Sequence, residues 1–73
     1  MENKIPEILS DRGLTISDLH AMIIRGGDRF SYTGLLELAK PTAGPLADGV
    51  KIGTLRKIAF ALGVKVRDLI GEE

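Results

Sequence analysis

Apolar residues recur along this chain at the spacing of short amphipathic helices. The clearest segment is 54–64, whose apolar positions at i, i+3, i+4 and i+7 are Leu55, Ile58, Ala59 and Leu62. That spacing puts them on one helix face, and Gly63 follows where a left-handed residue commonly ends a helix. The next residues repeat the pattern over one further turn with Val66, Leu69 and Ile70. Two short helices joined at a glycine corner are predicted, and they must pack against the upstream sequence.

Three further helices are predicted before them. Pro6 suits the first turn of a helix that Gly13 stops. Thr15 and Asp18 have the spacing of a capping box, which predicts a helix from there to Ile23 or Ile24. Ser31 can cap a third helix, which Pro41 ends near Ala39 or Lys40 because proline cannot continue it.

The segment 41–52 is the longest connection. Its Asp48-Gly49 pair is favoured in tight hairpin turns, so a small β-ribbon is one reading. Leu46 and Val50 favour the other, an irregular loop anchored by these two side chains. We expect a compact all-α, five-helix bundle forming one domain over residues 1–73, since 73 residues leave room for one core.

Charge is balanced overall but unevenly distributed. Ten basic residues match ten acidic ones, yet residues 25–60 hold six cations against three carboxylates, between acidic ends. Such a basic middle can be an electrostatic footprint for nucleic acid, or an ordinary mixed surface. The chain has no cysteine, no apolar run of membrane-spanning length and no signal-peptide pattern at its start, so a cytoplasmic protein without a membrane partner is expected.

The order of these elements resembles the lambda-repressor-like, or Xre-type, helix-turn-helix family. The resemblance covers about residues 5–70. Its strongest part is 54–64 with Val66, Leu69 and Ile70, which is similar to the family's fourth and fifth helices; 14–19 is similar to the start of its second helix. The resemblance implies a lambda-repressor-like bundle that acts as a small sequence-specific DNA-binding regulator, as a homodimer on double-stranded DNA.

In that family the third helix lies in the major groove, and the matching helix here is about residues 31–40. By the resemblance, base edges would face Ser31, Tyr32, Thr33 and Leu36. Phosphates would be reached by flanking cations, namely Arg25, Arg29, Lys40, Lys51, Arg56 and Lys57. Each also has an ordinary structural reading: a helix cap for Ser31, ring packing for Tyr32 and solvated surface for the cations.

The alternative is a protein-interaction or antitoxin-like module whose degenerate helix-turn-helix no longer reads bases. Its grounds are the zero net charge, the leucine-rich third helix and the long loop, with Leu36 as an exposed interface anchor. No enzyme is expected, since nothing orients Ser10, Asp11 and His20 as a nucleophilic triad. No cofactor or metal is expected either: His20 is the only histidine, and Gly26-Gly27 lacks the spacing of a phosphate loop.

Overall fold

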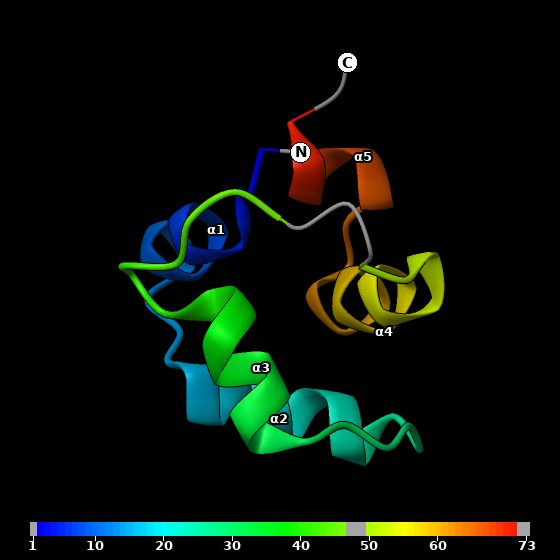
Figure 1. The fold of residues 1–73 in the computed structure, drawn as a ribbon. Coiled ribbons are helices and arrows are strands. Elements are labelled where there is room, and N and C mark those ends of the chain that lie inside the picture. Colours follow the sequence, from blue (N-terminus) through cyan, green and yellow to red (C-terminus); the bar gives the residue numbers. More distant parts are fainter. Residues whose placement is uncertain (1, 47–49, 72–73) are drawn as a thin grey trace.

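Residues 2–46 and 50–71 are described by a computed structural model, and within them the chain forms five α-helices and no strand (Figure 1). The helices are α1 (Ile5–Arg12), α2 (Ile16–Arg25), α3 (Tyr32–Ala39), α4 (Ile52–Leu62) and α5 (Val66–Ile70). The Cα radius of gyration of 10.9 Å is close to the roughly 11 Å of a folded chain this long. The expected all-α five-helix bundle is confirmed. None of these helices has both the length and the apolar character to cross a membrane.

The helix ends lie where local signals predict them. Gly13 and Gly63 follow α1 and α4 with φ of 65° and 70°, a left-handed conformation that glycine adopts without strain. At the start of α2 the Thr15 hydroxyl accepts the Asp18 N–H (3.1 Å), and the Asp18 carboxylate accepts the Thr15 N–H (2.9 Å). Both halves of the predicted capping box are therefore present.

The capping box gives folding a pH dependence. The backbone N–H and then the hydroxyl of Thr15 lower the pKa of Asp18, because both stabilise the carboxylate. A carboxyl group with a lowered pKa in the folded state contributes stability above its unfolded pKa, and that contribution is lost as the pH falls through the folded pKa. We expect acid to remove less stability from Asp18→Asn than from the parent. Urea unfolding of both at about pH 7 and about pH 3 measures this; parallel losses would contradict it.

One hydrophobic core holds the five helices together. Helix α2 packs on α3 and α4, α4 packs on α5, and α1 contacts both α3 and α5. All four apolar positions predicted for the fourth helix are buried. The residues with at most 1% exposure come from every helix: Ile5, Leu19, Ile23, Leu35, Leu55, Ile58 and Leu69. The C-terminal helices thus close over the N-terminal three, as the sequence predicts.

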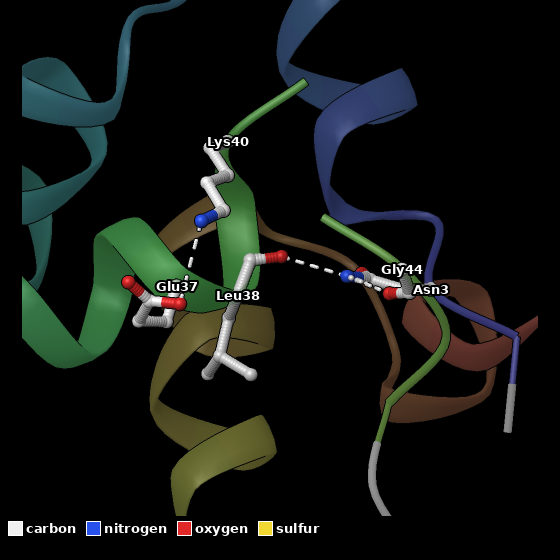
Figure 2. A network of polar contacts seen from close by, with 5 residues as sticks. All are labelled: Asn3, Glu37, Leu38, Lys40 and Gly44. Atoms are coloured by element: carbon white, nitrogen blue, oxygen red, sulfur yellow. Dashed lines mark hydrogen bonds and ion pairs between the residues drawn. The ribbon is translucent and has the colours of Figure 1, made fainter. Parts of the chain in front are cut away.

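The N-terminal residues tie α1 to distant segments, and the sequence gives no sign of this. The Asn3 amide donates to the carbonyls of Leu38 (2.7 Å) and Gly44 (3.3 Å) (Figure 2). Its Oδ1 accepts the Ile5 N–H. One side chain therefore starts α1 and fixes the end of α3. The Lys4 N–H donates to the Leu69 carbonyl (2.7 Å), which holds the residue before α1 beside α5.

The connection from α3 to α4 is irregular in its described residues. Leu46 is buried with 4% exposure, and half-buried Val50 packs against the core, so the two predicted anchors are confirmed. Residues 41–46 and 50–51 contain no strand, and therefore the β-ribbon reading is wrong for them. The two anchors hold the backbone to the core instead of pairing it with itself. Asp48-Gly49, the predicted hairpin turn, lies outside the described residues.

Candidate nucleic-acid interface

The α2–α3 unit presents one side of α3 to solvent. Leu35 and Ala39 bury the opposite side. Ser31 caps the helix by accepting the Gly34 N–H at 3.4 Å, and the exposed side chains of its first turn are Ser31, Tyr32 and Thr33. These three predicted residues are brought together where the first N–H groups of a helix lie open to an anion.

The turn between α2 and α3 is long but closely held. Gly26 and Gly27 continue hydrogen bonding to the last turn of α2, and Gly27 needs its φ of 91° to reverse the chain. His20 then ties the two helices together: its Nε2 lies 2.9 Å from the Phe30 carbonyl oxygen, and its ring meets Tyr32 edge-on with centroids 5.5 Å apart. The orientation of α3 on α2 is fixed by side chains as well as by the core.

Tyr32 is held by neighbouring side chains and yet remains partly exposed. The residue is 42% exposed, so part of it faces solvent. Its hydroxyl lies 3.3 Å from Ser17 Oγ, and the edge contact with His20 holds the ring. Tyr32 therefore stands at the start of α3 as a braced side chain. The supporting residues Ser17 and His20 were missed, because their partners are 10 to 15 residues away and follow no repeating spacing.

Leu36 differs from its predicted exposure. It is half-buried, although it does not belong to the side chains packed against the core. Its position, three residues after Thr33, places it beside that residue on the helix surface. Leu36 therefore contributes an apolar patch on the open side of α3, with part of the side chain covered.

The predicted cations fall into two groups. Arg25 ends α2, Arg29 lies in the turn, and both are exposed. The Lys57 ammonium donates to the Arg29 carbonyl at 3.2 Å, which places the middle of α4 against the turn. Arg25, Arg29 and Lys57 therefore form a cationic region where the α2–α3 turn meets α4. Within it, Lys57 is half-buried and its ammonium group already has a hydrogen-bond partner in the protein.

The remaining cations are placed differently. Lys51 and Arg56 are exposed, and Lys51 precedes α4 without capping the helix through its side chain. Lys40 pairs with the Glu37 carboxylate at 3.4 Å (Figure 2). Because this carboxylate partly neutralises it, Lys40 is the weakest candidate of the set for a phosphate contact.

Phe60 is a feature that the sequence reading missed. It lies within the apolar run of α4, yet its side chain is 77% exposed. A Cβ placed on Gly26 would lie 3.9 Å from the Phe60 ring, so the ring stands beside the α2–α3 turn. The signal was available: Ile52, Arg56 and Phe60 are four residues apart and share the side of α4 opposite to the buried Leu55, Ile58 and Leu62.

Comparison with protein families, curated proteins and solved structures gives no match for this chain. Among the residues that the structure describes, no three His, Cys, Asp or Glu side chains gather into a possible metal site. The geometry above is therefore the ground on which a function is proposed.

Proposed function

We propose that this protein is a small helix-turn-helix regulator of the lambda-repressor-like type that binds double-stranded DNA, with α3 in the major groove. The observation that carries the proposal is the open first turn of α3, on which Ser31, Tyr32 and Thr33 stand exposed beside the cationic α2–α3 turn. In helix-turn-helix proteins the N-terminal residues of the recognition helix contact base edges. We place this activity in the cytoplasm.

Phosphate contacts would flank that helix. Arg25 and Arg29 lie before α3 in the chain. Exposed Lys51 directly precedes α4 and exposed Arg56 lies on it, and α4 packs against α2. Contacts from such residues position a protein on the duplex, whereas the α3 side chains specify the sequence. Few base contacts are available on a helix of eight residues, so we propose that a homodimer reads two half-sites about one helical turn apart.

Selection from a random duplex library with the purified protein, repeated at two salt concentrations, tests this function. We expect an enriched motif with two related half-sites, and affinity that falls steeply with salt as counterions are released from the phosphates. If the protein binds no duplex even at the lower salt concentration, the proposal is overturned. Weak binding without a motif would remove the sequence-specific part and leave electrostatic attraction alone.

Exposed Phe60 favours a second candidate, a protein-interaction or antitoxin-like module. Phe60 is 77% exposed and lies on the same side of α4 as half-exposed Ile52, so it is a suitable anchor for a protein partner or a second copy. We expect Phe60→Ser to change self-association, measured by light scattering on a sizing column, while the melting temperature stays nearly unchanged because the ring contributes little to the core. Leu36→Ser is the matched variant on α3. If Leu36→Ser rather than Phe60→Ser disrupts association, the contact surface is α3.

A further inference from the structure

The open side of α3 has an unusual composition for a helix that reads DNA. The helix contains no arginine, asparagine or glutamine, the side chains that bind guanine or adenine through two hydrogen bonds. What it offers instead is hydroxyl groups, methyl groups and one carboxylate. If α3 reads bases, it must use chemistry other than paired hydrogen bonds to purines.

Two of the three hydroxyl groups already have partners within the protein. Ser31 Oγ accepts the Gly34 N–H, and the Tyr32 hydroxyl lies 3.3 Å from Ser17 Oγ. Thr33 is exposed and makes no side-chain hydrogen bond to any other described residue. Its methyl and hydroxyl groups are therefore the ones fully available to a base edge.

The second half of α3 is less suited to reading purines. The Glu37 carboxylate forms an ion pair with the Lys40 ammonium at 3.4 Å, so both charged groups at this end of the helix already have a partner (Figure 2). Between this pair and Thr33 lies Leu36, which is partly exposed and outside the core cluster. Thr33 and Leu36 are three residues apart and therefore neighbours on the helix surface, so together they form a small apolar patch on the open side of α3.

The C5-methyl group of thymine is the one apolar group on base edges in the major groove, and threonine methyl groups and other apolar side chains contact it. We infer that Thr33 and Leu36 read thymine methyl groups, so that each half-site contains thymine at the positions facing the first turns of α3. This inference rests on the proposed function, and it names the kind of duplex that the same surface selects.

The test uses the motif enriched from the duplex library and replaces its thymines one at a time by uracil, which pairs identically but lacks the methyl group. We expect about a fourfold loss of affinity when the replaced thymine faces the apolar patch of Thr33 and Leu36, because the contact of one methyl group is lost. We expect no loss at thymines outside the half-sites. In Thr33→Ser and Leu36→Ala the difference between thymine and uracil duplexes should shrink. Thr42→Ser is the matched control, because it makes the same change at an exposed threonine in the connection after α3, outside the proposed contact, and should retain the difference.

The outcomes separate the two proposals. Equal affinity for thymine and uracil at every position, with motif binding retained, would overturn the methyl reading and leave the proposed function standing. An enriched motif without thymine in its half-sites, or binding without any motif, would also overturn it. Failure to bind any duplex would overturn both. Circular dichroism of each variant confirms that a changed affinity does not come from unfolding.

Discussion

Replacing Leu55 by alanine is expected to lower the free energy of unfolding by about 2–5 kcal/mol. The side chain is fully buried in the middle of α4, the helix that packs on both α2 and α5. Truncation removes apolar contacts and leaves a cavity that a close-packed interior fills only in part. A domain of this length has roughly 4–11 kcal/mol of total stability, so this single change should remove a large share of it.

Phe60→Ala is the matched control in the same helix. It removes a larger apolar side chain, but that side chain is 77% exposed, so the stability should change by no more than about 0.5 kcal/mol. Urea unfolding followed by circular dichroism measures both variants. Equal losses, or a greater loss from Phe60→Ala, would mean that α4 faces the core with a different side.

The second large effect concerns DNA binding. Thr33→Glu is expected to weaken binding to the selected duplex by about 100-fold, because a carboxylate on the open side of α3 would lie close to the polyanion and like charges brought together cost several kcal/mol. The fold should tolerate the change. Thr33 is exposed in the first turn of α3, where the helix dipole favours a negative charge.

Arg67→Gln supplies the control for net charge, since it also lowers the charge by one. Arg67 is exposed on α5, which packs on α1 and α4 at the opposite end of the molecule from the first turn of α3 (Figure 1). Fluorescence anisotropy with a labelled duplex compares the two variants. If both weaken binding equally, the effect is one of overall charge and α3 has no special place in the interface.

The features that the sequence predicted well are those determined by neighbouring residues. The spacing of Leu55, Ile58 and Leu62 fixes which side of α4 is buried, whatever that side packs against. The reciprocal bonds of Thr15 and Asp18 need three residues of separation and nothing further. For the same reason, glycine after α1 and after α4 marked their ends correctly.

The features that escaped prediction depend on residues far apart in the chain. Asn3 bonds to Leu38 and Gly44 only because α1 lies beside the end of α3. Lys57 bonds to the Arg29 carbonyl only because α4 packs next to the turn. The amino-acid sequence alone could not distinguish a lysine that hydrogen-bonds to a distant backbone carbonyl from one that is free on the surface.

The apolar residues at the edge of the core were also difficult to place. The spacing of apolar residues predicts which way a side chain points from its helix. The exposure of a side chain at the edge of the core also depends on how far the neighbouring side chains extend. Leu36 is half-buried, whereas Phe60 is 77% exposed although its ring lies near Gly26 at the end of α2. The exposed side of α3 could therefore be predicted from the helical spacing, while the accessibility of single residues on it required the structure.

Titration of the isotope-labelled protein with the selected duplex, followed through backbone amide NMR signals, examines the proposed DNA surface most directly. We expect the largest shifts at residues 25–36, with smaller ones at the start of α4 and none in α5, because α3 enters the groove while the α2–α3 turn meets phosphates. Shifts confined to α1 and α5, with the signals of Ser31 to Leu36 unmoved, would contradict DNA recognition by α3.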